Sequence, residues 1–326
     1  MDSTLLAGVL LAVGLSAPAL WASPQVEEPA VQAVEQATEE PAAPAAEAVA
    51  AAGGDAAAPA DGQEAPEVQG TESEPQPEPE PELPTPELTG AEHETLAQKS
   101  LEAGDFDSAV FHWQRAIVSE PSNLRWGTDY RQAVIAVEAD GRKGAYDQCI
   151  EFFEGLAKVY GGVATVRLNL GYAYVDKLPI EGAITQVILA NKALREFTAA
   201  LAIEESWLGF YTRGNSYMYW PPIFGRTELG LADLERALDM AEALPSRPYH
   251  GRAWAALGDG YWRLENRDKM LEVWKEGLVR YPDTPELKER LGREGEELDQ
   301  WLERHFEPTQ RVATHLSELF AAGDVQ

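Results

Sequence analysis

The sequence contains a single cysteine, Cys149, among its 326 residues. One thiol forms no internal disulfide and cannot by itself hold a zinc ion. Cys149 falls on the apolar face of an expected helix, so we interpret it as a buried packing thiol rather than a reactive one. Packing of apolar side chains must therefore hold the fold together without disulfide or zinc cross-links.

Basic residues are missing from the first 98 positions, so all 26 Lys and Arg lie in 99–326. The formal net charge of the chain is −29. Binding to nucleic-acid phosphates or to an anionic membrane surface needs clustered positive charge. We therefore expect neither nucleic acid nor an anionic membrane surface to be a partner.

Signatures of catalysis are also scarce. The five histidines form no pair at metal-ligand spacing on one helix, no Gly-rich phosphate loop follows a strand, and no Gly-x-Ser-x-Gly elbow occurs. Carboxylate pairs such as Glu204 and Glu205 fall on solvated helix faces. The sequence thus predicts no catalytic residue, no bound metal and no cofactor, and we expect this protein not to be an enzyme.

The N-terminus carries an uncharged apolar run over residues 5–20, LLAGVLLAVGLSAPAL. The run is shorter than the ~20 residues of a spanning helix and ends in small residues that suit signal cleavage. We interpret 1–23 as a signal peptide or, because no Lys or Arg precedes the run, as an uncleaved signal anchor. The chain is then exported to the periplasm or cell envelope, close to the membrane only through this segment. The alternative is a cytosolic protein with an apolar N-terminus.

Aromatic residues are absent from 24–90, where Ala, Pro, Glu and Gln dominate. Such a composition buries too little apolar area to offset the entropy lost on ordering. Alternating prolines favour an extended backbone, and unbalanced carboxylates repel one another. We expect a disordered acidic linker, which either reaches across a periplasm or cell wall or serves only as a solubilising leader.

The rest of the chain repeats one helical pattern. In 104–121, GDFDSAVFHWQRAIVSEP, a helix face carries Ala109, Trp113 and Ala116 at i, i+4 and i+7. The small residues let two helices approach closely, and the aromatic ring fills the gap to the next pair. The same face recurs four more times, at Cys149, Phe153 and Leu156, at Ala193, Phe197 and Ala200, at Gly230, Leu234 and Ala237, and at Met270, Trp274 and Gly277.

A second pattern lies in the helix that precedes the last of these faces. Trp254, Leu257, Gly258 and Tyr261 are spaced as Trp-x2-Leu-Gly-x2-Tyr. Together with the five recurring faces, this pattern resembles the tetratricopeptide repeat (TPR) family over about 91–284. The resemblance implies an all-α solenoid of about five helical hairpins, near 90–123, 124–163, 164–206, 207–250 and 251–284. The charged amphipathic segments of 285–326 are expected to form helices that cap the stack.

Two spacings depart from the family pattern. Nineteen residues separate Tyr174 from Ala193, and the extra apolar residues are expected to lengthen the helices of the third unit or to add a flap. A Pro-Pro pair then ends the first helix of the fourth unit within YMYWPPIFGRT. This segment forms either a lid over the groove or an exposed docking patch, built from Trp220, Ile223, Phe224 and Arg226.

Stacked hairpins curve, so the first helices of the units are expected to line a concave groove. Residues offset from the core positions should project into that groove and bind a partner by aromatic anchoring and polar contacts. The candidates are Leu168, Tyr172 and Asp176 in the third unit, Tyr211, Asn215, Met218 and Tyr219 in the fourth, and Arg252, Asp259, Trp262 and Arg263 in the fifth. Alternatively, several of these aromatic residues pack beneath the insertions.

The sequence therefore predicts an exported, non-catalytic scaffold or adaptor that holds a peptide or helix of a cell-envelope protein in the concave groove. Two alternatives remain open. One is a permanent structural subunit of a membrane-associated complex. The other is a small-ligand carrier in which the insertion of the third unit closes an apolar pocket.

Overall fold

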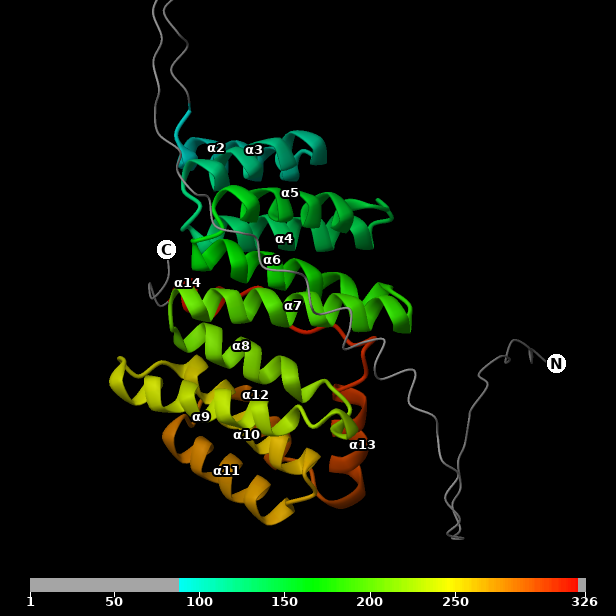
Figure 1. The fold of residues 1–326 in the computed structure, drawn as a ribbon, viewed down its shortest axis with the longest axis vertical. Coiled ribbons are helices and arrows are strands. Elements are labelled where there is room, and N and C mark those ends of the chain that lie inside the picture. The colour runs from blue at the N-terminus through cyan, green and yellow to red at the C-terminus, as the bar shows by residue number, and fades with distance from the viewer. Residues whose placement is uncertain (1–87, 322–326) are drawn as a thin grey trace, which may run out of the picture. The chain divides into compact units, whose positions relative to one another are not determined.

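The structure is a computed structural model that describes residues 88–321 (Figure 1). All regular structure in these residues is helical, which confirms the predicted all-α fold class. The expected signal segment and residues 24–87 of the expected linker lie outside the described range. Within 88–321, no helix is both long and apolar enough to span a bilayer.

Ten helices form five hairpins that stack on one another along the chain (Figure 1). The pairs are α2 (Gly90–Glu102) with α3 (Phe106–Ser119), α4 (Leu124–Ala139) with α5 (Ala145–Val159), α6 (Ala164–Lys177) with α7 (Ala183–Ile203), α8 (Trp207–Met218) with α9 (Thr227–Ala243), and α10 (Gly251–Arg263) with α11 (Arg267–Arg280). Short 3-10 turns, η2 (Leu178–Ile180), η3 (Pro222–Phe224) and η4 (Pro248–His250), lie between some of them.

Local sequence sets where the helices begin. Thr89 precedes α2, and its hydroxyl accepts a hydrogen bond from the Glu92 N–H at 3.3 Å. The Glu92 carboxylate accepts one from the Thr89 N–H at 2.7 Å, which completes a reciprocal cap. Side chains of Asp105 and Asn266 cap α3 and α11 in the same first-turn position.

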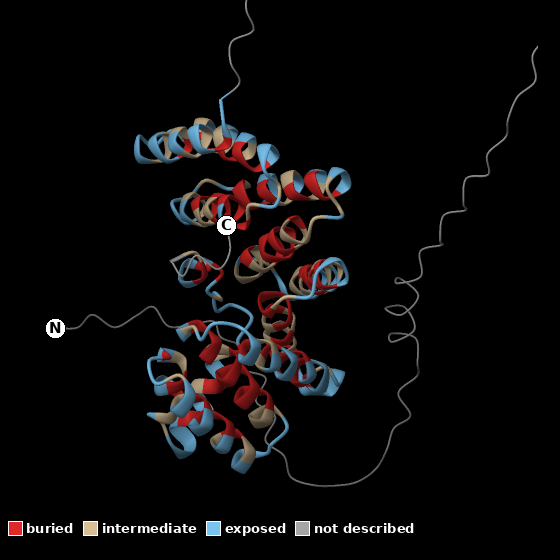
Figure 2. Ribbon diagram, turned by 90° about the vertical axis from the view of Figure 1, so that its left-hand side faces the viewer, coloured by how far each residue is buried: buried red, intermediate tan, exposed pale blue. Residues whose placement is uncertain are grey.

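The five recurring faces form the core between the helices. Each face has at least one fully buried residue, for example Ala109, Phe153, Phe197, Leu234 and Trp274. Figure 2 shows buried residues gathered where the helices face one another. The approach at Gly258 is so close that a Cβ atom there would lie 2.2 Å from the indole nitrogen of Trp274. Cys149 is buried as expected, and this burial raises the pKa of its thiol.

The insertion in the third unit lengthens one helix. After α6, the turn η2 leads into α7, which has 21 residues and begins ten positions before the core residue Ala193. The helices α3, α5, α9 and α11 begin three or four positions before their first core residue, so the extra residues add about two turns to the N-terminal end of α7. This outcome matches the first of the two expected arrangements, a longer helix rather than a separate flap.

The C-terminal residues fall into two parts. Helices α12 (Pro285–Leu291) and α13 (Gly295–His305) follow the last hairpin, and α12 packs on α10 and α11 as a cap. The expectation that all of 285–326 caps the stack needs a correction beyond this point. Residues 306–321, which end in the short helix α14 (Ser317–Ala321), turn back along the stack and contact α4, α6 and α10 (Figure 1).

Candidate functional site

The concave side of the stack holds the segment 306–321, which we call the C-terminal strap. Its first residue, Phe306, is 5% exposed and stacks on Trp262, with ring centroids 6.1 Å apart. Tyr219 meets the same ring edge-on at 5.0 Å, and the Arg263 guanidinium lies 4.4 Å from its centroid. Three of the expected groove residues therefore come together to hold one aromatic side chain of the strap.

Thr314 is the second anchor of the strap and is buried. Its hydroxyl donates to the Asp176 carboxylate at 2.5 Å and accepts from the Gln132 amide at 3.3 Å. Its carbonyl oxygen accepts from Arg131 at 3.2 Å. The strap is thus fixed in the second and third hairpins by polar contacts, through one side chain and one backbone group.

Arg131 organises the polar floor beneath Thr314. The Arg131 and Asp176 side chains are 1% and 3% exposed, and their ion pair is 2.6 Å long. The same guanidinium donates to Asn169 at 3.2 Å and lies over the Tyr172 ring at 4.8 Å. A buried ion pair survives only when its remaining hydrogen-bonding atoms are also satisfied, and these contacts supply that satisfaction.

A second buried ion pair joins the fifth hairpin to the cap. Arg290 of α12 donates to both carboxylate oxygens of Asp259, at 2.6 and 2.5 Å. Their side chains are 5% and 2% exposed. At the groove edge, Arg252 bridges Glu286 of α12 and Glu318 of the strap, at 2.9 and 2.7 Å.

The expected groove residues therefore divide into groups. The expectation that all of them project into an open groove is wrong for the buried members, because other parts of the chain cover them. Those members are Leu168, Tyr172, Asp176, Met218 and Asp259. Of the half-buried residues, Tyr219, Trp262 and Arg263 hold Phe306, and Arg252 holds Glu318. Tyr211 stacks on Trp207, and its burial raises its pKa to about 12.

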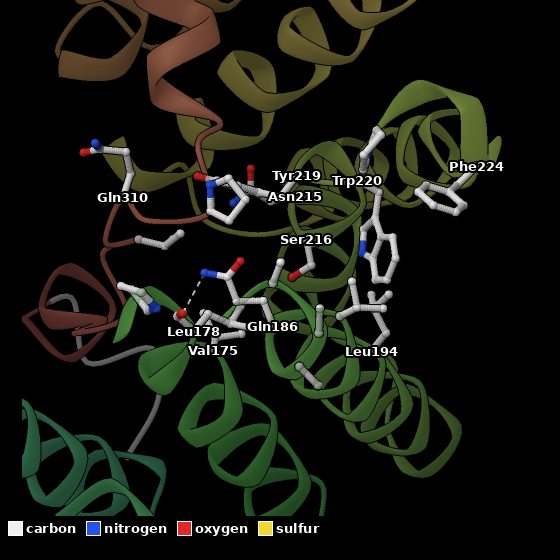
Figure 3. A pocket seen from close by; sticks show the side chains of 18 residues that line it. Val175, Leu178, Gln186, Leu194, Asn215, Ser216, Tyr219, Trp220, Phe224 and Gln310 are labelled. Atoms are coloured by element: carbon white, nitrogen blue, oxygen red, sulfur yellow. Dashed lines mark hydrogen bonds between the residues drawn. The ribbon is translucent and has the colours of Figure 1, made fainter. Parts of the chain in front are cut away.

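An open cleft of about 270 Å³ adjoins the strap (Figure 3). We call it the α7 cleft. Its apolar walls come from η2 and α7, from the loop between α8 and α9, and from the strap, with Leu178, Val187, Leu194, Trp220, Phe224, Pro308 and Val312 among the lining residues. No charged side chain lines it.

Polar atoms in the α7 cleft come from amides and hydroxyls. The Gln186 amide donates to the Leu178 carbonyl at 3.1 Å, and the Ser216 hydroxyl donates to the Thr212 carbonyl at 2.7 Å. The Asn215 and Gln310 side-chain amides have no hydrogen-bond partner among residues 88–321. Asn215, expected in the concave groove, thus faces this cleft instead (Figure 3).

Exposed apolar residues continue from the cleft onto the surface. On α7, Ile184, Val187 and Ile188 occupy i, i+3 and i+4 and are 82%, 49% and 53% exposed. Across the cleft, Ile223 and Phe224 are 90% and 58% exposed. Val187 and Phe224 line the cleft, and Ile184, Ile188 and Ile223 are sequence neighbours of lining residues and border it.

The segment around Trp220 is divided between its two expected roles. Trp220 is buried beneath the Arg226 guanidinium, which lies 3.7 Å from the ring centroid. Arg226 also donates to the Asn191 side chain of α7 at 3.1 Å. Trp220 and Arg226 therefore fix the loop against α7, whereas Ile223 and Phe224 remain exposed.

Sequence spacing missed one histidine pair. His93 of α2 and His112 of α3 place their Nδ1 atoms 2.9 Å apart. Nothing in the spacing along either helix signals this contact, because it depends on how the two helices of the hairpin align. Two imidazoles are too few for a typical metal site, and residues 88–321 contain no group of three metal-ligating side chains.

The last hairpin and the helix that follows it match a known family. The tetratricopeptide repeat family model covers residues 251–294, which contain α10, α11 and α12. Residues 251–294 are therefore a tetratricopeptide repeat, and the four preceding hairpins share its arrangement of paired helices. Tetratricopeptide repeats commonly bind protein partners, and the matched repeat supports a protein-interaction scaffold.

Solved structures with a similar chain path include TPR proteins. The MamA protein is 17% identical over 59% of this chain and 91% of its own, with a TM-score of 0.40. A thermophilic TPR protein of Thermus thermophilus is 18% identical, over 62% and 97%, with a TM-score of 0.44. A TPR protein of Parabacteroides merdae is 15% identical, over 71% and 79%, with a TM-score of 0.41. Similarities of this size say nothing about what this chain binds, and no curated protein matches its sequence.

Proposed function

We propose that this protein is a non-catalytic scaffold that binds an apolar helix or extended segment of a partner protein in the α7 cleft. The observation that supports this most is that α7 is apolar on two sides. One side packs Leu189, Ala193 and Phe197 into the core, and the other exposes Ile184 and its neighbours. A helix that is apolar all round is normally covered on both sides.

The chemistry of the α7 cleft favours a protein segment as its occupant. An uncharged apolar lining suits aliphatic or aromatic side chains. The free amides of Asn215 and Gln310 each offer a donor and an acceptor, which match the N–H and C=O groups of a peptide backbone. The net charge of −29 disfavours anionic lipid and nucleic acid at this surface.

The partner is proposed to be a cell-envelope protein. The apolar run at residues 5–20 supports export of the chain, and the acidic stretch that follows supports a tether. Cell fractionation together with sequencing of the mature N-terminus tests this part separately. Recovery of the chain in the cytosol with residues 1–23 intact would contradict export without affecting the cleft.

A matched pair of exposed residues tests the cleft. Ile184 on α7 and Val279 on α11 are each 82% exposed. Photo-crosslinking from position 184 in the native cell identifies the partner, and the affinity of the purified partner is then measured. We expect Ile184→Asn to weaken binding at least tenfold and Val279→Asn to leave it within twofold. Equal affinity for both variants would refute the α7 cleft as the docking site.

The uncharged apolar lining of the α7 cleft and its volume of about 270 Å³ favour one second candidate, a carrier of a small neutral apolar ligand. The insertion supplies part of its wall, through Leu178, Pro179, Ala183 and Val187. Native mass spectrometry separates the two functions, since a carrier retains a bound small molecule through purification. A partner that stays bound in high salt would instead favour the permanent-subunit alternative, because an obligate interface is larger and more apolar.

A further inference from the structure

We infer that the C-terminal strap is a displaceable internal ligand of the concave groove, and that a partner segment with the same pattern of side chains takes its place. The pattern is an aromatic residue, then Thr eight positions later, then Leu two and five positions after that Thr, as in Phe306, Thr314, Leu316 and Leu319. This inference concerns the concave groove, which shares a wall with the α7 cleft, because Pro308, Gln310 and Val312 of the strap line that cleft. The two proposals are tested on different residues, so one can fail without the other.

The aromatic position is defined by the seat of Phe306. Trp262 stacks on the ring, Tyr219 closes its edge, and Arg263 covers it with a delocalised cation. Buried aromatic seats of Trp, Tyr and Arg are typical of sites that dominate binding energy. An aliphatic residue would fill the volume but would lose the ring stacking and the cation–π contact.

The threonine position is defined by hydrogen bonds from two hairpins. The Thr314 hydroxyl donates a hydrogen bond to Asp176 and accepts one from the Gln132 amide. The Thr314 backbone carbonyl accepts one from Arg131. The site therefore recognises a side-chain hydroxyl and a backbone carbonyl of the same residue. Valine has nearly the same shape as threonine but no hydroxyl, so it would leave the Oδ1 atom of Asp176 buried without a hydrogen-bond donor. The site should therefore strongly prefer threonine over valine.

The two leucine positions complete the pattern at the far end. Leu316 and Leu319 are 5% and 4% exposed, and Glu318 between them pairs with Arg252. Acidic side chains on a partner segment would meet the same arginine. The groove thus offers an aromatic seat, a hydroxyl seat and an apolar seat, in a fixed order along about 14 residues.

Several features make the strap displaceable. Residues 307–311 and Ala313 are exposed, so the strap is held at separated points rather than along its length. Leu316 has a φ of 53°, in the left-handed region that a bulky side chain disfavours. The five recurring faces contain no strap residue, and the strap adds only Phe306, Leu316 and Leu319 to the buried apolar cluster.

The experiment uses the full chain and a fluorescent synthetic peptide of residues 304–321. In the chain, Leu316→Asp with Leu319→Asp detaches the strap without changing a hairpin residue. The control variant, Leu244→Asp with Val279→Asp, places the same charges at exposed leucine and valine positions. Fluorescence anisotropy then measures peptide affinity for the wild-type chain and for both variants.

We expect the strap variant to bind the peptide at least tenfold more tightly than the wild-type chain and the control variant do. A peptide carrying Thr314→Val should bind the strap variant about tenfold more weakly, and Gln132→Ala in the chain should reduce that difference. Equal peptide binding to all three chains, or none to a folded strap variant, would overturn the inference. Loss of the cooperative helical unfolding transition in the strap variant would also overturn it, because the strap would then be a structural element.

A milder variant gives a second readout. Thr314→Val in the full chain removes only the hydroxyl, while Thr314→Ser keeps it. We expect backbone amides of the strap in the valine variant to exchange hydrogen several-fold faster, with no change in the hairpins. Unchanged exchange in the strap would show that the hydroxyl seat does not hold it, against the inference.

Discussion

The seams between the hairpins and the concave face of the stack are closed by different chemistry. The seams are filled by small and aromatic residues that recur along the chain, such as Ala109 and Phe153. The concave face is closed by ion pairs and by a strap whose contact with Arg131 joins residues 183 positions apart. The comparison teaches that a repeat pattern specifies how units stack, whereas the face that differs between units is specified by unique, distant contacts.

The largest effect should come from the seams. Phe153→Ala removes a fully buried ring, and we expect it to lower the free energy of unfolding by about 4 kcal/mol through lost burial and the cavity left behind. Phe111→Ala is the matched control, because Phe111 is half exposed. Chemical denaturation followed by circular dichroism measures both. Similar losses in the two variants would contradict the assignment of the seam.

The concave ion pair at the cap should come next. Arg290→Leu leaves the Asp259 carboxylate buried without its partner, and we expect it to lower the free energy of unfolding by about 3 kcal/mol. Replacing both residues by Leu should recover most of this loss, because no unpaired charge then remains. A double-mutant cycle of denaturation curves measures the coupling. A double variant whose loss equals the sum of the losses in Arg290→Leu and Asp259→Leu would show that the pair has no energetic coupling.

A smaller, pH-dependent effect is expected near the aromatic seat. Burial, together with the nearby positive charge of Arg290, lowers the pKa of His305 below its ordinary value of 6.5. The unfolded chain then takes up the proton first as the pH falls below 6.5. The free energy of unfolding should therefore decrease as the pH falls from 6.5 to the pKa of His305 in the folded chain. Above pH 6.5, His305 should make no contribution to the pH dependence.

His305→Gln tests this effect, since it removes the titrating group. Thermal unfolding of the variant between pH 7 and pH 5 should lose the component of the pH dependence that comes from His305. An identical pH dependence in both proteins would place the titration elsewhere.

The smallest effect on stability should come from the rim of the α7 cleft. Ile184→Asn changes a side chain that is 82% exposed, so we expect the free energy of unfolding to stay within about 0.5 kcal/mol of wild type. Thermal denaturation checks this value. A large loss would mean that Ile184 supports the fold, and the apolar surface of α7 would no longer require a partner.

The sequence carries enough information for the seams and too little for the concave face. Small and aromatic residues at i, i+4 and i+7 predict which side chains pack between hairpins, because the neighbouring hairpin presents the same pattern. The partners of Asp176 and Asp259 depend on the alignment of helices from different units, which no local spacing encodes. Residues 307–316 have neither helical nor strand periodicity, so their seat became visible only with the structure.

The loop after α8 shows the same limit on a smaller scale. Its apolar composition predicted that the loop would be covered, but the sequence left open whether the groove of this chain or a partner protein would cover it. Trp220 is covered by the Arg226 guanidinium, which in turn donates a hydrogen bond to Asn191 in the lengthened helix α7. Ile223 and Phe224 received no such cover within residues 88–321.

The strap also affects how the protein unfolds and the order in which it folds. In an ordinary solenoid each unit interacts only with its neighbours, so the ends fray independently. Here a single segment links Arg131 of the second hairpin with Arg252 and Trp262 of the fifth, which couples their unfolding. Residues 306–321 leave the ribosome after every hairpin they touch, and N-terminal units fold first during synthesis. The concave side therefore stays open until residues 306–321 have been made and have docked onto it.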